Sequence, residues 1–328
     1  MTEAALLEGK VVVVTGGGRG VGRAHALACA ARGARVLVND LGCDVHGRGS
    51  DPAVAEEVAQ AIRAAGGEAV ADATDVAGLE GPARVIERAT RELGRVDAVI
   101  GAAGVVVDRT VLKMDDALLD RMIDVHVRGG FGLVRAAARA MIDGGHGGSI
   151  VLHTAPVAFF GALRQAALAA ASAAVAGLVR SAAIELRKHG VRVNAIAPTA
   201  RTRTTEDLPL FRGIAESSMG PEFVGPVGVF LASERSAEVT GEIVGVAGRA
   251  STRCGAARRR GTSGRGARSR RRPSPPRGPK SRAPERAAPP EMGRDGIEPA
   301  QIDPAQIDSA QIDSAQIDSA PDRLSPDR

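Results

Sequence analysis

The chain of 328 residues contains no tyrosine and no tryptophan. Any catalytic mechanism that uses a phenol as its proton donor is therefore excluded. Cysteine is also scarce, because the chain has only Cys29, Cys43 and Cys254, and no two of them are close in sequence. A sparse and odd set of thiols is typical of a reducing compartment rather than of a disulfide framework. We therefore expect a cytoplasmic protein.

Long uncharged apolar runs are absent as well. No stretch approaches the roughly 20 apolar residues that a membrane-spanning helix needs. The first ten residues carry Glu3 and Glu8 and lack the apolar core of a signal peptide. These absences predict a soluble protein without a membrane partner.

The net charge of +5 is distributed unevenly along the chain. Residues 253–294 hold 14 basic and 2 acidic side chains, whereas residues 295–328 hold 2 and 8. Residues 1–252 then hold 27 basic and 28 acidic side chains and are nearly neutral. The basic character belongs to the C-terminal segment, so it does not indicate that the remainder of the chain binds nucleic acid.

Short runs rich in Val and Ile alternate with Ala-rich segments over the first 250 residues. Continuous apolar strands separated by helices are typical of a parallel sheet that is covered on both faces. The sequence therefore predicts an α/β protein with a doubly wound parallel sheet, the Rossmann fold, in one domain at residues 1–252. We expect strands at 11–14, 35–38, 68–71, 98–100, 149–152, 191–196 and 243–246, and helices near 21–32, 52–65, 80–93, 115–141, 165–188 and 222–233.

The C-terminal segment has a different composition. Residues 253–298 are rich in Arg and Pro, and residues 299–328 repeat a unit of Ala-Gln-Ile-Asp. Neither stretch can bury enough apolar surface to offset the loss of chain entropy, so we predict a disordered tail. We favour a solvated tail without a partner. The alternative is that its basic part contacts the phosphates of a nucleic acid.

The strongest motif is a glycine-rich segment that follows the first apolar strand. It reads Thr-Gly-Gly-Gly-Arg-Gly-Val-Gly and contains Gly16, Arg19, Gly20, Val21 and Gly22. In such a motif one glycine permits the tight turn, another lets the backbone approach a pyrophosphate, and a third lets the helix pack on the strand. The helix N-terminus then presents unpaired N–H groups to phosphate. The segment predicts a dinucleotide site.

Acidic residues after the next two strands complete this predicted site. Asp40 follows the second strand, where a carboxylate can accept hydrogen bonds from the adenosine ribose and repel a 2′-phosphate. Asp40 therefore favours NAD over NADP, although the guanidinium of Arg19 could pair with a 2′-phosphate. Asp75 and Val76 follow the third strand and could cap the adenine pocket. Turn formation alone is the alternative interpretation for Asp40 and Asp75.

These motifs, together with Asn-Ala-Ile-Ala-Pro at 194–198, resemble the short-chain dehydrogenase/reductase family. Within that family, the segments 38–42, 125–129 and 197–200 are similar to the dehydrogenase domain of peroxisomal multifunctional enzymes. The resemblance runs from about Gly9 to Gly248. It implies a nicotinamide dinucleotide as cofactor, further cofactor contacts at Ala103, Gly104 and Pro198, and a homo-oligomer in which the helix at 165–188 lies at the interface. It also implies that 201–221 covers the pocket.

The catalytic signature of the family is missing. The family uses a Tyr, a Lys four residues later, and a Ser thirteen residues before the Tyr. In this register those positions are Leu168, Ser172 and Ala155. The Asn-Asn-Ala-Gly motif after the fourth strand likewise reads Gly-Ala-Ala-Gly at 101–104. Leu168 cannot carry a proton and Ser172 has no charge with which to lower a neighbour's pKa. The pattern predicts impaired catalysis.

Two histidines could in principle replace the missing acid. His126 stands where the multifunctional enzymes have His, and we interpret it as ordering water or backbone near the helix, with a catalytic role as the alternative. His153 ends the fifth strand and is the other speculative acid. We expect no metal site.

Three functions remain open at this point. The first is an NAD-binding protein of oxidoreductase descent with impaired catalysis. The second is an active NAD-dependent oxidoreductase of a hydroxyacyl or steroid-like alcohol or carbonyl compound that uses another proton donor. The third is a non-enzymatic scaffold or a decaying gene product.

Overall fold

The structure is a computed structural model that describes residues 5–254, except 207, 209, 210 and 212. Its centre is a sheet in the order β3-β2-β1-β4-β5-β6-β7-β8, in which only the pairing of β7 with β8 is antiparallel. The predicted doubly wound parallel sheet is confirmed. The strands are β1 (Val11–Thr15), β2 (Arg35–Asn39), β3 (Ala69–Asp72), β4 (Ala98–Gly101), β5 (Gly148–His153), β6 (Val191–Thr199), β7 (Ile243–Ala247) and β8 (Ala250–Arg253).

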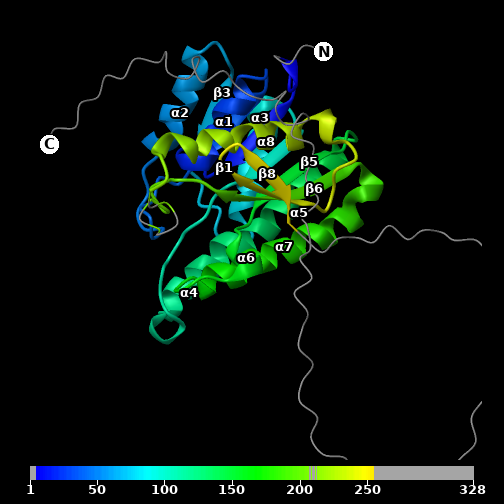
Figure 1. Cartoon of the computed structure of the whole chain (residues 1–328). Coiled ribbons are helices and arrows are strands. Elements are labelled where there is room, and N and C mark those ends of the chain that lie inside the picture. The colour runs from blue at the N-terminus through cyan, green and yellow to red at the C-terminus, as the bar shows by residue number, and fades with distance from the viewer. Residues whose placement is uncertain (1–4, 207, 209–210, 212, 255–328) are drawn as a thin grey trace, which may run out of the picture.

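Helices cover both faces of the sheet (Figure 1). One core layer packs α1, α2 and α8 on the sheet, and the other packs α3, α5 and α7 on the opposite face. The α-helices are α1 (Gly20–Ala30), α2 (Ala53–Ala64), α3 (Gly81–Leu93), α4 (Asp116–Met122), α5 (Gly130–Asp143), α6 (Val157–Phe160), α7 (Ala166–Leu186) and α8 (Gly225–Ala232). Shorter helical turns are η2 (Val111–Lys113), the π-helix η3 (Ile123–Gly129), η4 (Arg187–His189), η6 (Glu216–Ser218), η7 (Pro221–Phe223) and η8 (Glu234–Ser236).

Complete burial of the strands explains their unbroken apolar runs. Val11 to Val14 of β1 are each 0% exposed, because the sheet has a helical layer on either side. The chain order reverses between β1 and β4, and in doubly wound sheets ligands bind beyond the carboxyl ends of the strands at such a reversal.

Several elements of the fold differ from the sequence-based predictions, and the short helix α6 is one that was not predicted. The continuous helix expected at 115–141 is divided into α4, η3 and α5, because η3 widens the helix over seven residues. Strand β8 was not predicted, since its sequence Ala-Ser-Thr-Arg has no apolar run. It extends the sheet to Arg253, one residue beyond the predicted domain boundary. The two predicted tail segments lie, except for 253 and 254, outside the described residues.

Helix α7 is long and apolar. The expectation that no stretch approaches the length of a membrane span was wrong, because Ala166–His189 could cross a membrane by length and composition. Half of its apolar window is buried inside the protein. Val175 and Val179 of this helix pack in the same layer as the inner side chains of the sheet. A buried core helix meets the same criteria as a membrane span, so this helix is weak evidence for one.

Candidate active site

A cleft of about 280 Å³ lies along the carboxyl ends of the strands. It brings together residues that are far apart in the sequence and that belong to six different strand ends. All the predicted cofactor residues line it: Gly16, Arg19, Gly20, Val21, Gly22, Asp40, Asp75, Val76, Ala103, Gly104 and Pro198. The substituted catalytic positions Ala155, Leu168 and Ser172 and the histidines His126 and His153 line the same cleft.

The glycine-rich turn forms the floor of the cleft, and close packing explains its composition. Gly16 has a φ of +66°, and a Cβ atom there would lie 2.6 Å from the Cα atom of Ala103. A Cβ atom on Gly22 would lie 1.9 Å from the carbonyl oxygen of Gly16. Helix α1 begins at Gly20 without a side-chain cap from Arg19, so its first N–H groups remain available to a phosphate.

Asp40 is held in a fixed orientation at the end of β2. Its Oδ2 accepts a hydrogen bond from Gly18 N at 2.9 Å, and its Oδ1 accepts one from Gly42 N at 2.8 Å. A carboxylate has about four acceptor sites, so lone pairs remain for two ribose hydroxyl groups. Asp40 therefore ties the glycine-rich turn to the loop after β2 and keeps acceptor capacity on the cleft wall.

Two arginines at the mouth of the cleft share one acceptor. Arg19 Nη1 donates to the carbonyl oxygen of Cys43 at 3.0 Å, and Arg203 Nη2 donates to the same oxygen at 3.2 Å. This contact joins the segment after β6 to the loop after β2, so that Thr202 and Arg203 flank the cleft. Cys43 and Arg203 were not assigned from the sequence, because only the fold brings the two loops together.

Asp75 lines the cleft after the end of β3. Its Oδ2 forms an ion pair with Arg121 Nη1 at 3.1 Å, and its Oδ1 accepts a hydrogen bond from Ala77 N. Arg121 comes from α4 and was not predicted as a site residue. The pair holds the segment after β3 against the helix that follows β4.

The three substituted catalytic positions carry no titratable group. Leu168 is 8% exposed and packs in an apolar cluster with Met122 and Val125. Ser172 is 2% exposed, and the carbonyl oxygen of its backbone accepts a hydrogen bond from Thr154 Oγ1 at 2.8 Å. Ala155 contributes only a methyl group to the cleft wall. The polar side chains that line this end of the cleft are His126, His153, Thr154 and Ser172.

His153 is bonded to the buried side chain of His25. Its Nε2 lies 3.1 Å from Nε2 of His25 of α1, and the two rings stack with centroids 5.1 Å apart. Burial lowers the pKa of His153 to about 4, and burial together with the charge of His153 lowers the pKa of His25. Both rings are therefore neutral at physiological pH.

His126 contacts the backbone on the other side of the cleft. Its Nε2 lies 3.2 Å from Val105 N and 2.8 Å from the carbonyl oxygen of Val105, so the ring can accept from one or donate to the other. Burial lowers the pKa of His126. A Cβ atom on Gly104 would lie 2.8 Å from this ring, so the glycine leaves room for it.

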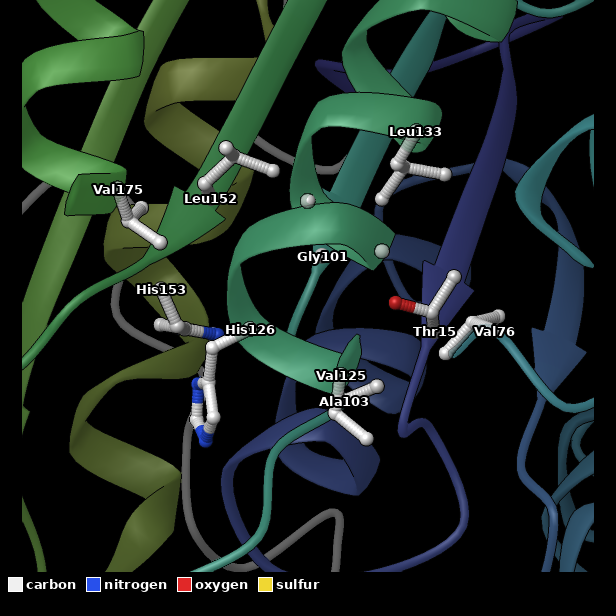
Figure 2. A pocket seen from close by; sticks show the side chains of 12 residues that line it. Thr15, Val76, Gly101, Ala103, Val125, His126, Leu133, Leu152, His153 and Val175 are labelled. Atoms are coloured by element: carbon white, nitrogen blue, oxygen red, sulfur yellow. The ribbon is translucent and has the colours of Figure 1, made fainter. Parts of the chain in front are cut away.

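A smaller cavity of about 20 Å³ lies behind these histidines (Figure 2). Thr15, His126 and His153 provide its polar lining, and Leu133, Leu152 and Val175 are among its apolar walls. At Gly101, where the family has Asn, a Cβ atom would lie 2.9 Å from side-chain atoms of both leucines. The two leucines thus restrict the space for a side chain at 101.

Within residues 5–254, leaving aside the four that are not described, no group of three or more His, Cys, Asp and Glu side chains could hold a metal ion.

Known proteins resemble this chain in sequence. The family model for short chain dehydrogenases matches residues 10–209. A short-chain type dehydrogenase/reductase of Mycobacterium tuberculosis is 39% identical over 232 residues, which are 71% of this chain and 80% of that protein. Peroxisomal multifunctional enzyme type 2 of the mouse is 38% identical over 231 residues. These are 70% of this chain but 31% of that enzyme, so the match covers only part of the larger protein.

Solved structures agree with the sequence relatives. The crystal structure of carveol dehydrogenase from Mycobacterium avium in complex with NAD has a TM-score of 0.67 and 29% identity. The match covers 74% of this chain and 97% of that one. The parallel sheet, the cleft at its switch point and the family match lead to one conclusion: this chain belongs to the short-chain dehydrogenase/reductase family of oxidoreductases and has its nicotinamide-dinucleotide-binding fold.

Proposed function

We propose that the chain binds NAD and that its hydride-transfer chemistry is impaired. The observation that carries this proposal is that one cleft holds all the predicted dinucleotide-binding residues together with three substituted catalytic positions that supply no group able to ionise near neutral pH. Gly16, Gly20 and Gly22 would hold the pyrophosphate, and Asp40 would hold the adenosine ribose. NAD supplies the hydride chemistry when bound. The protein would contribute binding and orientation.

The preference for NAD over NADP rests on Asp40. A 2′-phosphate would lie against its carboxylate, and like charges at such a distance repel. Arg19 and Arg203 each donate through one nitrogen to the carbonyl oxygen of Cys43, and their remaining N–H groups are the feature that would favour a 2′-phosphate instead.

This preference is testable by fluorescence titration of the full chain with NADH and NADPH. We expect NADH to bind at least about tenfold more tightly, and Asp40→Ala to reduce that ratio toward one, because removal of a charge repulsion favours the phosphorylated cofactor. Asp44→Ala is the matched control, since Asp44 is an exposed acid of the same loop. Equal affinity of the wild-type chain for both cofactors would contradict the assignment of Asp40.

The proposed impairment concerns the proton that accompanies hydride transfer. An alcohol or carbonyl substrate must exchange a proton at its oxygen, and Leu168 and Ala155 cannot provide one. His153 is neutral at physiological pH, and its Nε2 already pairs with His25. Nε2 of His126 is similarly occupied by the backbone of Val105. Neither imidazole is thus positioned as a general acid.

A second candidate function is an active oxidoreductase with His153 as an unusual proton donor. Its support is that His153 lines the cleft beside Ala155 and Leu168. Under this alternative, His153→Gln removes all turnover of an alcohol substrate while NAD binding stays unchanged. Under the favoured proposal, wild type and His153→Gln are equally slow.

We also propose that the chain forms a homodimer through α7. The outward face of this helix carries small or apolar side chains that are exposed: Ala166, Ala170, Ala173, Ala174, Gly177 and Ile184. A Cβ atom on Gly177 would meet nothing within 4 Å, so a second helix has room to approach. Small side chains allow close contact between helices that pack ridges into grooves.

Ala173→Glu is expected to convert the dimer into a monomer, because each copy would then bury a carboxylate against an apolar helix. Light scattering after size exclusion should report a fall to the chain mass of 33.5 kDa. Ala64→Glu, at an exposed position of α2, is the control and should remain dimeric. A dimer that survives Ala173→Glu, or a monomeric wild type, would rule out this interface.

A further inference from the structure

Asn39 lines the cleft, but neither the proposed NAD contacts nor the proposed dimer gives this residue a role. It is the last residue of β2 and is 1% exposed. On one side it pairs in register with Thr15 of β1, and on the other with Asp72 of β3. Asn39 therefore stands where three strands end together at the adenosine half of the cleft.

The side-chain amide of Asn39 joins β2 to the segment after β3. Its Nδ2 donates to Oδ1 of Asp72 at 2.7 Å and to the carbonyl oxygen of Thr74 at 2.9 Å. Both partners are acceptors only, so the orientation of the amide is determined. The backbone carbonyl of Asn39 in turn accepts a hydrogen bond from Gly17 N at 2.9 Å. One residue thus contacts the glycine-rich turn and the third strand end.

Asp72 makes this contact a strong one. It is 3% exposed and also accepts hydrogen bonds from Thr74 N at 2.9 Å, from Thr74 Oγ1 at 3.2 Å and from Arg88 Nη1 at 3.1 Å. Hydrogen bonds to a buried charged acceptor are stronger than those between neutral groups. The network fixes Thr74, and Thr74 precedes Asp75 on the cleft wall.

We infer that Asn39 is a positioning residue that sets the distance between the three walls of the adenosine site. It acts through its neighbours: Gly17 in the glycine-rich turn, Asp40 next along the chain, and Thr74 beside Asp75. The inference rests on the proposed function, because the site it shapes is the proposed NAD site. Among the residues that the structure describes, the side chain of Asn39 bonds only to Asp72 and Thr74, so the nicotinamide half of the cleft near Leu168 and Ala155 lies outside its influence.

The test compares ligands that fill different halves of the cleft in the full chain. Asn39→Leu keeps the approximate shape and removes both donated hydrogen bonds. We expect calorimetry to show that NAD and ADP-ribose both bind about tenfold more weakly, since one charge-assisted and one neutral hydrogen bond no longer hold the wall in place. Reduced nicotinamide mononucleotide, which lacks adenosine, should bind as it does to the wild type.

Asn194→Leu is the matched control. Asn194 is also fully buried on a strand and donates to the carbonyl oxygen of Val239 at 2.8 Å, but it does not line the cleft. This variant should lower the melting temperature without changing the affinity for ADP-ribose. Asn39→Ser, which is smaller and retains one donor, serves if Asn39→Leu does not fold, and should weaken ADP-ribose about threefold.

The possible results distinguish a failure of the proposed NAD binding from a failure of the positioning role of Asn39. A wild-type chain that binds neither NAD nor ADP-ribose overturns the proposed function and this inference with it. A wild-type chain that binds both, together with a folded Asn39 variant whose ADP-ribose affinity is unchanged, overturns this inference alone. An equal loss for the mononucleotide and for ADP-ribose would also overturn it, because the effect would then be a general loss of structure.

Discussion

The triple variant Ala155→Ser, Leu168→Tyr, Ser172→Lys is expected to raise kcat/KM for NAD-dependent oxidation of a secondary alcohol by about 10²–10⁴-fold. The Tyr would exchange a proton with the substrate oxygen, and the Lys one helical turn later would lower the pKa of its phenol. The Ser would donate a hydrogen bond to the same substrate oxygen. All three positions line the cleft, so the new groups would reach a ligand held there.

The measurement is steady-state formation of NADH with a hydroxyacyl thioester and a hydroxysteroid as substrates. Groups that act as a unit do not add simply, so the single substitutions should each have little effect. Arg109→Tyr is the control, because it creates a Tyr four residues before Lys113 at exposed positions that do not line the cleft. A wild type that already oxidises these substrates with a kcat/KM of about 10⁴ M⁻¹ s⁻¹ or more would contradict impaired catalysis.

An unchanged rate in a folded triple variant would show that the pocket has changed further. The packing around Gly101 indicates where the pocket has changed, because Leu133 and Leu152 would both collide with a side chain at that position. Restoring an Asn at 101 would then require smaller residues at 133 or 152.

Acidification is expected to destabilise the fold by about 2 kcal/mol between pH 7 and pH 5 through His153 alone. Burial lowers the pKa of its ring from 6.5 to about 4 in the folded state, so the unfolded chain binds more protons in this range. Stability is therefore complete above about pH 6.5 and is lost as the pH falls toward 4. His25 and His126 have pKa values lowered by burial and act in the same direction.

Urea unfolding at pH 7 and pH 5 measures this loss. His153→Gln cannot bind the proton, so its free energy of unfolding should change less between the two pH values than that of the wild type, by about 2 kcal/mol. His189→Gln, at an exposed position, should follow the wild type. Parallel losses for wild type and His153→Gln would show that His153 is not the buried neutral group described here.

The residues that form the cofactor wall could be predicted from the sequence because each is required by its local backbone geometry. Gly16 and Gly22 are needed within one tight turn, and Asp40 directly follows a strand that the apolar pattern identifies. Parallel strands bring such residues to one edge without any knowledge of tertiary contacts. The order of β1 to β7 could be predicted for the same reason, since each of these strands contains a short apolar run, which β8 lacks.

Other parts of the site depend on contacts that no local pattern reveals. The His25–His153 pair joins residues 128 positions apart, and Arg203 reaches Cys43 across 160 positions. The interruption of the long helix by η3 was also not predicted, because Ala- and Val-rich helical sequence does not show where the hydrogen-bond spacing widens. Asn39 resembles any polar strand end until its bonds to Asp72 and Thr74 are seen.

The most direct test of the central claim is a calorimetric titration of the full chain with NAD. The proposed function predicts saturable binding of one NAD per chain in the micromolar range, and loss of this binding in Gly16→Val, where a side chain would collide with the backbone of Ala103. A well-folded wild-type chain that releases no heat with NAD, and that binds NADH no better, would contradict it. The chain would then have the dinucleotide-binding fold without the ability to bind NAD.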